Sequence, residues 1–282
     1  MYSLLTMKLD PSIGIELKKL RNDEFLTNKE EIIKKLSSLL INAVKKRTSK
    51  IPLAIAFSGG IDSTLLAFIC EKLKQPFSLY TVGLDKSKDM ISAKEVAKEM
   101  NWKLTTKTYE VENLEPLFKE VIEITKKRDV VTVGVGAVTL AVLKLMKENI
   151  IFTGLGSEEI FAGYERHKEN IHEACWEGLL NIYERDIVRD SSLAKHYDKE
   201  TRLPFLDKDL IEYGMRIHPS LKVADFKKQI LREAAVNLGL PKEIAFRKKC
   251  AAQYGSKFDF ALQKLAKEKG ILKKEYLSQL SP

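Results

Sequence analysis

A short glycine-containing stretch combines the residue types that hold a phosphorylated ligand. It reads Ser58-Gly59-Gly60-Ile61-Asp62-Ser63. The apolar run at 51–57 predicts a buried parallel strand before it, and helical apolar spacing at 64–70 follows it. A strand, a tight loop and a helix start direct several backbone N–H groups at one point, where pyrophosphate fits. The two glycines allow close approach of the ligand, and the two serines add hydroxyl donors.

Asp62 narrows what this loop can bind. A carboxylate would repel a bare phosphate, so its position indicates a ligand for Mg²⁺ carried on the phosphates. No lysine follows the glycines, which excludes the GxxxxGK[ST] loop of kinases and GTPases. A simple Ser-Gly-Gly turn is the plain alternative, but the flanking strand and helix favour a phosphate loop. The stretch resembles the SGGxDS loop of the N-type ATP pyrophosphatases, which split ATP into AMP and pyrophosphate.

Length and cysteine content are typical of an ordinary globular protein. A chain of 282 residues suits one large domain or two fused ones. Cys70, Cys175 and Cys250 are far apart and form no CxxC, so neither a zinc site nor a redox pair is expected. No apolar run is long enough to span a bilayer, and the early charge at Lys8 does not fit a secretory signal. We therefore expect a cytoplasmic protein without membrane association.

The basic charge balance raises the question of a nucleic-acid partner, because the net charge is +9 and the isoelectric point is about 9.2. The lysines are spread over the chain, and Lys45-Lys46-Arg47 is the densest local run. A spread of this kind favours a lysine-rich solvated surface over an RNA partner.

Strands and helices alternate through the first half of the chain. A capping box, Thr27 with Glu30, opens the first helix. The alternation predicts an α/β fold, a parallel sheet with helices on both faces that binds ligands at the carboxyl ends of its strands. Beyond the first strand, the predicted strands are 77–82, 102–108 and 149–153, and the predicted helices are 27–44, 88–100, 114–126 and 137–147.

The pattern changes beyond the fourth strand. From about Phe161 onwards the periodicity is helical, and no convincing strand is present. We divide the chain into an N-terminal segment of unassigned role (1–27), a nucleotide-binding α/β domain (28–160) and a helical lobe (161–282). The lobe is expected to close one side of the ligand crevice.

A second glycine loop follows the strand at 149–153. Ser157 can cap the helix behind it, and Glu158 or Glu159 can favour the first turn, which is the plain interpretation. Carboxylates that face the phosphate loop would also complete a metal site with Asp62. The stretch reads Thr153-Gly154-Leu155-Gly156-Ser157-Glu158-Glu159-Ile160-Phe161-Ala162-Gly163-Tyr164.

Two later stretches carry basic residues that could contact phosphates or stabilise charge on a tetrahedral intermediate. The first runs from Glu200 to Asp207 and contains Arg202. The second runs from Lys228 through Arg232 to Lys249. Taken singly, each is better explained as a solvated helix face.

Taken together and in this order, these stretches resemble the synthetase domain of asparagine synthetases and of β-lactam synthetase, over about residues 28–259. The resemblance implies an adenine-nucleotide α-hydrolase-like sheet with added helices. It also implies an enzyme that adenylates a carboxylate with Mg-ATP, releases pyrophosphate and lets an amine attack the acyl-adenylate.

The resemblance assigns roles residue by residue. Lys249 and Asp62 are the expected catalytic residues, and Lys249 matches a lysine that stabilises the transition state. Asp62 and Glu158 are the expected metal ligands. Arg202 and Asp207 match a stretch that shapes the substrate side. The residues expected to hold pyrophosphate and the nucleotide are Phe57, Ser58, Gly59, Gly60, Ser63, Val82, Thr153 and Gly154.

Three departures from the family pattern bear on the substrates. The family's glutaminase domain begins with a nucleophilic Cys, whereas this sequence begins Met1-Tyr2, so we expect no glutamine hydrolysis by this chain. Leu155 stands where the glycine loop usually carries Glu, and an apolar side chain cannot act as a base or accept a hydrogen bond. Gly134 stands where the family usually places an Arg. Leu155 and Gly134 count against aspartate as the carboxylate.

The sequence therefore predicts an ATP- and Mg²⁺-dependent carbon–nitrogen ligase, with asparagine as the default product. Its expected partners are a small-molecule carboxylate and an amine or ammonia, and a separate glutaminase subunit and a homodimer are left open. A tRNA-modifying ATP pyrophosphatase is one alternative. The positive charge of the chain fits this function, but the sequence contains no CxxC motif. A non-catalytic nucleotide-binding subunit is another, which Leu155 and Gly134 would allow.

Overall fold

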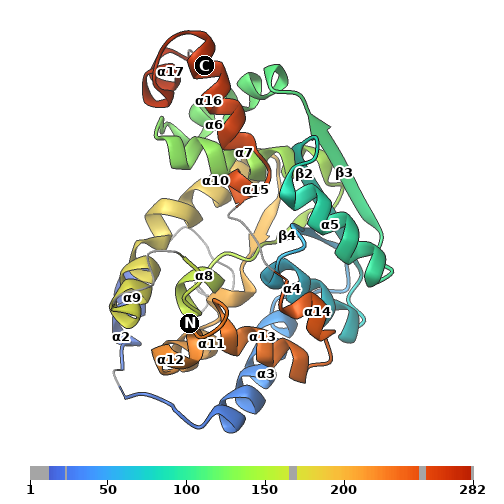
Figure 1. The fold of residues 1–282 in the computed structure, drawn as a ribbon, viewed down its shortest axis with the longest axis vertical. Coiled ribbons are helices and arrows are strands. Elements are labelled where there is room, and N and C mark those ends of the chain that lie inside the picture. Colours follow the sequence, from blue (N-terminus) through green and yellow to red (C-terminus); the bar gives the residue numbers. More distant parts are fainter. Residues whose placement is uncertain (1–12, 23, 165–169, 248–251, 281–282) are drawn as a thin grey trace.

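A five-stranded parallel sheet forms the centre of the protein. The computed structural model describes residues 13–22, 24–164, 170–247 and 252–280 (Figure 1). Neighbouring strands follow the order β3-β2-β1-β4-β5, and every pair is parallel. The strands are β1 (Leu53–Ala56), β2 (Phe77–Leu84), β3 (Leu104–Tyr109), β4 (Ile150–Phe152) and β5 (Glu200–Arg202).

The strand order reverses between β1 and β4. From β1 the chain builds outwards through β2 and β3, and it then returns to the other side of β1 to add β4 and β5. Ala54 and Ile55 pair with Ile151 and Phe152 across this junction. In parallel α/β sheets the crevice at such a switch point is where ligands bind. The loops after β1 and after β4 both open there.

Side chains alternate between the two faces of the sheet and enter two separate cores. On β1, Leu53 and Ile55 pack into one core, while Ala54 packs into the other. The first core contains residues of α3 (Lys29–Lys45), α4 (Ile61–Lys72) and α5 (Lys88–Glu99). The second contains residues of α6 (Glu115–Thr125), α7 (Val130–Leu145), α16 (Phe258–Glu268) and α17 (Lys273–Gln279), so helices cover both faces, as the alternation predicted.

The two groups of helices occupy opposite ends of the long axis, with α16 and α17 at one end and α3 and α13 at the other (Figure 1). Besides α3, α4 and α5, the longer helices are α6 (Glu115–Thr125), α7 (Val130–Leu145), α9 (Ile171–Ile182), α10 (Val188–His196), α11 (Lys208–Met215), α13 (Gln229–Asn237) and α16 (Phe258–Glu268). The shorter ones are α2 (Ile13–Lys19), α8 (Ser157–Ile160), α12 (Pro219–Lys222), α14 (Lys242–Ala245), α15 (Ala252–Gly255) and α17 (Lys273–Gln279).

The expectation of no strand beyond Phe161 was wrong, because β5 pairs with β4 through Thr201 and Ile151. β5 is only three residues long and begins with an exposed Glu200, so it carries no apolar alternation for a sequence pattern to detect. The division of the chain at Phe161 remains an expectation. The sheet takes its fifth strand from residues beyond that point.

Two helix starts also differ from the sequence prediction. The helix predicted at 137–147 begins at Val130, because the Asp129 side chain accepts a hydrogen bond from the Thr132 amide at 2.8 Å and caps it. The cap of α3 is Asn28 and not Thr27, since the Asn28 side chain accepts from the Glu31 amide at 3.4 Å. In both cases the capping side chain, rather than propensity alone, sets the first turn.

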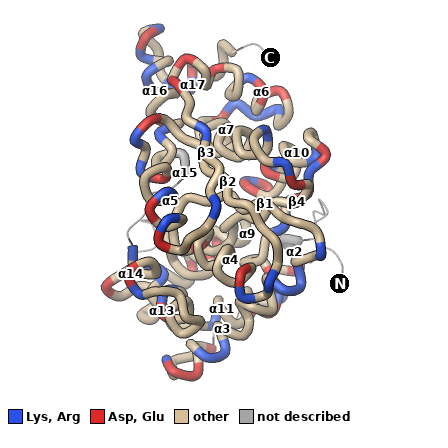
Figure 2. Tube along the Cα trace, turned by 90° about the vertical axis from the view of Figure 1, so that its right-hand side faces the viewer, with Lys and Arg blue, Asp and Glu red and all other residues tan. Residues whose placement is uncertain are grey.

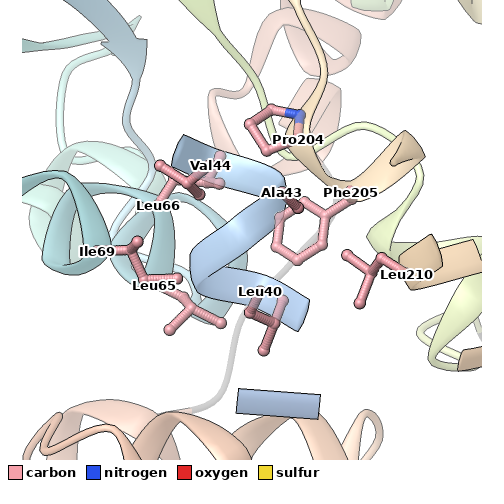
Figure 3. Close-up of a pocket in the computed structure, with 9 residues that line it drawn as sticks. All are labelled: Leu40, Ala43, Val44, Leu65, Leu66, Ile69, Pro204, Phe205 and Leu210. Atoms are coloured by element: carbon pink, nitrogen blue, oxygen red, sulfur yellow. The ribbon is translucent and has the colours of Figure 1, made fainter. Parts of the chain in front are cut away.

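A small apolar gap, too narrow for a ligand, lies between α3, α4 and residues 204–210 (Figure 3). Its lining is entirely aliphatic and aromatic apart from the proline ring, so it offers no donor for a phosphate and is a gap in packing. The lining residues are Leu40, Ala43, Val44, Leu65, Leu66, Ile69, Pro204, Phe205 and Leu210.

Basic and acidic residues are interspersed along the chain in the view of Figure 2, on helices at both ends of the molecule. This distribution agrees with the spread of lysines along the sequence. Among the described residues, no helix has the length and apolarity needed to cross a bilayer.

Candidate active site

The phosphate loop connects β1 to α4 as the sequence predicts. Gly59 has a positive φ of 69°, and a Cβ there would lie 2.6 Å from the Ser92 carbonyl, so only glycine fits. Ser92 Oγ donates to the Gly59 carbonyl at 3.3 Å and fixes the loop against α5. The first-turn amides of α4 have no partner within the helix, and donors of this kind suit an anion, so phosphate binding at this loop stays a prediction.

The two serines of the loop contact each other. Ser63 Oγ accepts from the Ser58 amide at 3.2 Å, and the two hydroxyl oxygens lie 3.4 Å apart. Ser63 Oγ also donates to the Gly60 carbonyl at 3.3 Å. These contacts hold the loop in a tight turn ahead of α4 and bring both hydroxyls to the end of β1.

Asp62 and Glu158 converge on one ammonium group. Lys228 Nζ donates to both oxygens of Asp62, at 2.8 and 2.7 Å, and lies 2.8 Å from Glu158 Oε1. Ser157 Oγ donates to Asp62 Oδ1 at 2.6 Å. The side chains of Asp62 and Lys228 are only 6% and 5% exposed, whereas Glu158 is 29% exposed at the edge of the cluster.

Two glycines make room for this cluster. A Cβ on Gly154 would lie 2.8 Å from Asp62 Cβ, so the loop after β4 packs directly against the start of α4. A Cβ on Gly163 would lie 1.7 Å from Glu158 Oε2 and 2.3 Å from Lys228 Cε. Substitution at either glycine would therefore displace the charged side chains.

The charge state of Lys228 follows from its two partners. Burial by itself lowers the pKa of this lysine, but the charges of Asp62 and Glu158 outweigh it, so the pKa is raised above its usual value. Lys228 therefore remains an ammonium. Arg232 is a second basic residue near these carboxylates: burial lowers its pKa, and the charges of Asp62 and Glu158 oppose that lowering.

The donor types suit a divalent cation, because carboxylate oxygens are the protein ligands that Mg²⁺ prefers. Within the described ranges, no group of three or more His, Cys, Asp or Glu side chains is arranged to hold a metal ion. Asp62 and Glu158 would therefore supply two carboxylates, and phosphate oxygens and water would complete the shell, as is usual for Mg²⁺. The residues present fit the metal only when it comes with a phosphorylated ligand.

A buried carboxylate lies directly behind Glu158. Glu159 is fully buried, and its Oε1 accepts from Tyr164 Oη at 3.1 Å and from Arg185 Nη2 at 2.8 Å. Burial raises the pKa of Glu159, and the positive charge of Arg185 opposes that rise. Arg185 lies in a π-helical turn, Tyr183–Ile187, a local widening that often occurs at functional sites.

The ionic network continues away from Glu159 into the protein. Arg185 Nε donates to Asp186 at 2.6 Å, and Arg189 Nη1 donates to Asp186 at 2.9 Å. Arg189 also makes a bidentate pair with Asp190, at 2.8 and 3.1 Å, and is almost completely buried. This network fixes α10 against α7, where a Cβ on Gly136 would lie 3.4 Å from Arg189 Cδ.

The residues predicted to contact the nucleotide differ in how far their side chains are buried. Phe57 and Val82 are each 2% exposed, and Phe57 packs edge-on against Trp102, so both could contribute only their backbone. Thr153 and Gly154 are partly exposed in the loop between β4 and α8. The Leu155 amide donates to Thr153 Oγ1 at 3.4 Å, which folds this loop back on itself.

Arg202 and Asp207 belong to another cluster. Asp207 is buried and pairs with Arg47 Nη1 at 2.9 Å and with Lys46 Nζ at 3.2 Å. Arg202 pairs with Glu200 at 2.8 Å and donates to the Arg47 carbonyl. These contacts hold the end of α3, and the role of the two residues on the substrate side stays a prediction.

Lys249 and its neighbour Lys248 lie outside the described residues, so the catalytic role of Lys249 stays a prediction. The residues ahead of them are well anchored. Arg232 Nη1 donates to the carbonyls of Ala245 and Arg247, at 2.5 and 3.1 Å. Arg247 in turn pairs with Glu95 and Glu99 on α5, at 2.6 and 2.8 Å.

Two positions that depart from the family pattern have ordinary apolar surroundings. Leu155 is half-buried and packs against the first core, and Gly134 is buried within α7. Sequence reasoning did not connect Lys228 and Ser157 with Asp62. The available signal was that Lys228 and Arg232 are four residues apart, beside the apolar positions Ile230 and Leu231, which places basic side chains on a buried face.

The sheet order and the helices on both faces define a parallel α/β protein with a switch point between β1 and β4. The family then follows from comparison with known sequences, because the asparagine synthase family model matches residues 35–177 and 168–278. The chain belongs to the asparagine synthase family and represents its synthetase part.

Individual relatives agree with this assignment. The chain is 29% identical, over an aligned length of 303 residues, to a protein of Methanocaldococcus jannaschii provisionally named glutamine-hydrolysing asparagine synthetase 1, covering 89% of this chain and 55% of the relative. It is 30% identical over 250 residues to the glutamine-hydrolysing asparagine synthetase of Homo sapiens, covering 80% of this chain and 44% of the relative. The chain thus spans about half the length of the curated relatives it matches. Among solved structures, the NMN synthetase of Francisella tularensis is similar with a TM-score of 0.43 and 17% identity, over 91% of this chain and 89% of that one.

Proposed function

We propose that this protein is an ATP-dependent ligase that joins a carboxylate to ammonia or an amine through an acyl-adenylate. The observation that carries the proposal is the convergence of two loops at the switch point of the sheet. The phosphate loop after β1 brings Asp62, and the loop after β4 brings Glu158, to a common ammonium within 2.8 Å of each carboxylate. Membership of the asparagine synthase family supports the same reaction class.

Different residues would bind the pyrophosphate, hold the metal and stabilise the transition state. The first-turn amides of α4 and the hydroxyls of Ser58 and Ser63 bind the pyrophosphate oxygens. Asp62 and Glu158 would hold Mg²⁺, which when bound neutralises phosphate charge. Lys249 would stabilise the charge that develops at the α-phosphate, where stabilisation exceeds that of the ground state.

The reaction proceeds in two balanced steps. A carboxylate oxygen attacks the α-phosphorus, the bond from this phosphorus to the bridging oxygen breaks, and pyrophosphate leaves. The amine nitrogen then attacks the acyl carbon, the bond to the adenylate oxygen breaks, AMP leaves, and the nitrogen loses a proton. The aliphatic side chain of Leu155 cannot accept that proton, so the base lies elsewhere in the site or on the substrate.

The choice of substrates is the least constrained part of the proposal. Leu155 and Gly134 count against aspartate, so asparagine formation is the first product to test and not the only one. The curated relatives carry names that include glutamine hydrolysis, and this chain spans about half of their length. Ammonia delivered by a separate glutaminase subunit is therefore one source to test beside free ammonia and other amines.

A screen of carboxylates with the purified chain and Mg-ATP tests this function. We expect AMP and pyrophosphate in equal amounts with the correct carboxylate, and an amide when an amine is added. Glutamine alone should yield no glutamate. Release of ADP and phosphate instead would contradict adenylation.

A matched pair of glycine variants links the activity to the phosphate loop. Gly59→Ala should abolish AMP release, because its Cβ would lie 2.6 Å from the Ser92 carbonyl. Gly239→Ala is the control, since Gly239 also has a positive φ, of 103°, but the nearest atom to its Cβ is 3.6 Å away. Equal activity in the two variants would separate the reaction from this loop.

A further inference from the structure

The ammonium of Lys228 occupies the space between the two carboxylates that the proposed metal would need. Three of the four oxygens of Asp62 and Glu158 lie within 2.8 Å of Lys228 Nζ. Asp62 Oδ1 also accepts from Ser157. An ammonium and a divalent cation demand the same lone pairs, so the two cannot share these oxygens fully.

The backbone of Lys228 is fixed, while its side chain is long enough to change partners. Lys228 has a left-handed backbone, with φ of 57°, and its carbonyl accepts from the Arg232 amide at 3.0 Å at the start of α13. Arg232 Nε holds the preceding carbonyl of Lys227 at 2.9 Å. The side chain passes Gly163, where a Cβ would lie only 2.3 Å from Lys228 Cε, so the path to the carboxylates depends on that glycine.

We infer that Lys228 is a positioning residue of the proposed metal site: its ammonium holds Asp62 and Glu158 together in the nucleotide-free protein and competes with a divalent cation for their oxygens. This inference rests on the proposed function. Without the ammonium, two carboxylates at this spacing would repel each other in a buried site. The Lys228 ammonium keeps the two carboxylates in place. It also neutralises part of their negative charge, which weakens their attraction for a metal ion that arrives without a nucleotide.

The consequence is an order of binding. Mg²⁺ alone should bind weakly, because it must compete with Lys228 for two carboxylates and finds no third acidic ligand in the described part of the chain. The phosphates of a nucleotide bring additional oxygens for the metal and an alternative anion for the ammonium. The structure thus favours entry of the metal together with the nucleotide.

The test uses Mn²⁺ alone, followed by electron paramagnetic resonance, and thermal unfolding in EDTA or in excess Mn²⁺, all without nucleotide. The main variant is Lys228→Met, which keeps the length of the side chain and removes the charge. Lys228→Gln is the milder second variant, because its amide can still donate to Asp62. Lys227→Met is the matched control at the neighbouring position, where the side chain is only half-buried.

The wild-type protein and Lys227→Met should bind Mn²⁺ weakly and melt at the same temperature with and without it. Both Lys228 variants should bind Mn²⁺ about 10- to 1000-fold more tightly, the range by which one neighbouring charge shifts an ionisation equilibrium. They should melt at a lower temperature in EDTA and recover in Mn²⁺, since the metal replaces the missing positive charge. A Lys228→Met chain that folds only with Mn²⁺ would support the same conclusion.

Unchanged or weaker Mn²⁺ binding in the Lys228 variants that fold would overturn the inference, and so would failure of both variants to fold in EDTA and in Mn²⁺ alike. The latter outcome would mean that Lys228 is needed for folding and has no specific role in the metal site. These Mn²⁺ measurements contain no nucleotide and are therefore independent of the carboxylate screen. If Mn²⁺ rescues the Lys228 variants but the wild type releases no AMP in that screen, the proposed function is refuted and this role of Lys228 stands.

Discussion

The Leu84 amide donates a hydrogen bond to the Ser256 carbonyl at 2.9 Å, joining the last residue of β2 to the C-terminal part of the chain. A Cβ on Gly255 would lie 2.2 Å from Asp89 Oδ1, so the same stretch also packs closely on α5. On the other side of residues 248–251, Arg232 holds the carbonyl of Arg247. The described residues on both sides of 248–251 are thus anchored, and Ser256 is held at the carboxyl end of β2.

The role that the family resemblance assigns to Lys249 leads to a prediction. Lys249→Ala should lower pyrophosphate release by about 10²–10³, because one donor aimed at the developing charge is worth that much in turnover. Mg-ATP affinity, measured by calorimetry, should stay nearly unchanged, since the stabilisation acts in the transition state. Lys249→Arg should not restore activity, because a planar fork does not replace a compact ammonium.

Lys248→Ala is the internal control for that experiment. It removes the same charge one residue away and should have little effect on pyrophosphate release. Equal, small effects at Lys248 and Lys249 would mean that both side chains belong to a solvated face. The catalytic role that the family resemblance assigns to Lys249 would then be wrong.

Gly163→Ala should disable Mg-ATP binding. Its Cβ would lie 1.7 Å from Glu158 Oε2 and 2.3 Å from Lys228 Cε, so Glu158 and Lys228 must move apart. Overpacking of this kind costs about 1–3 kcal/mol, which corresponds to binding about 5- to 150-fold weaker in calorimetry. Gly270→Ala is the control: Gly270 has a positive φ of 70°, so the new side chain strains the backbone, but no atom lies within 4 Å of its Cβ, and binding should be unaffected. Wild-type affinity in Gly163→Ala would remove the cluster from the nucleotide site.

The ionic network behind Glu159 should make a large contribution to stability. Arg189→Met would leave Asp186 and Asp190 without their buried partner, which typically costs about 3–5 kcal/mol in free energy of unfolding. Arg216→Met is the control near the surface, because Arg216 and Glu24 are 3.6 Å apart and Glu24 is 83% exposed, and it should cost less than about 1 kcal/mol. Urea unfolding measures both. Similar losses would show that the buried network contributes no more than a surface pair.

Lys222 should make stability depend on pH. It is fully buried, its Nζ donates to the Met215 carbonyl at 3.5 Å, and burial lowers its pKa to about 8. The unfolded chain binds more protons than the folded chain between pH 8 and 10.5, so stability should rise with pH across this window. Below pH 8 the full penalty applies, on the order of 3 kcal/mol.

Lys222→Met removes this penalty and keeps the volume of the side chain. Urea unfolding should find the variant more stable than the wild type at pH 7, with a smaller difference at pH 10. Lys195→Met, at an exposed position on α10, should give the same small difference at both pH values. A constant gap between wild type and Lys222→Met would mean that Lys222 does not titrate in this window.

The features that the sequence predicted are those carried by contiguous residues. The loop after β1 could be placed because two glycines and Asp62 follow an apolar run within a few positions. Strands β2 to β4 could be placed because each is itself a short contiguous run. Lys228 could not be placed beside Asp62, because 166 positions separate them and only the packed fold brings them together. β5 was missed for a similar reason: Thr201 is a strand residue only because Ile151 is there to pair with it.

The pairing of Ala54 with Ile151 also bears on how the protein acquires its site during synthesis. Contacts between distant parts of a chain form slowly, because the entropy of closing a long loop is lost before the contact is gained. The phosphate loop leaves the ribosome early, yet its neighbours on β4 and α13 follow much later. A nascent chain that ends before Ile151 would carry β1 with one edge unpaired, a hazard for association with other chains. Folding of the crevice is therefore expected to be among the last events, and chaperones would act on a half-built sheet.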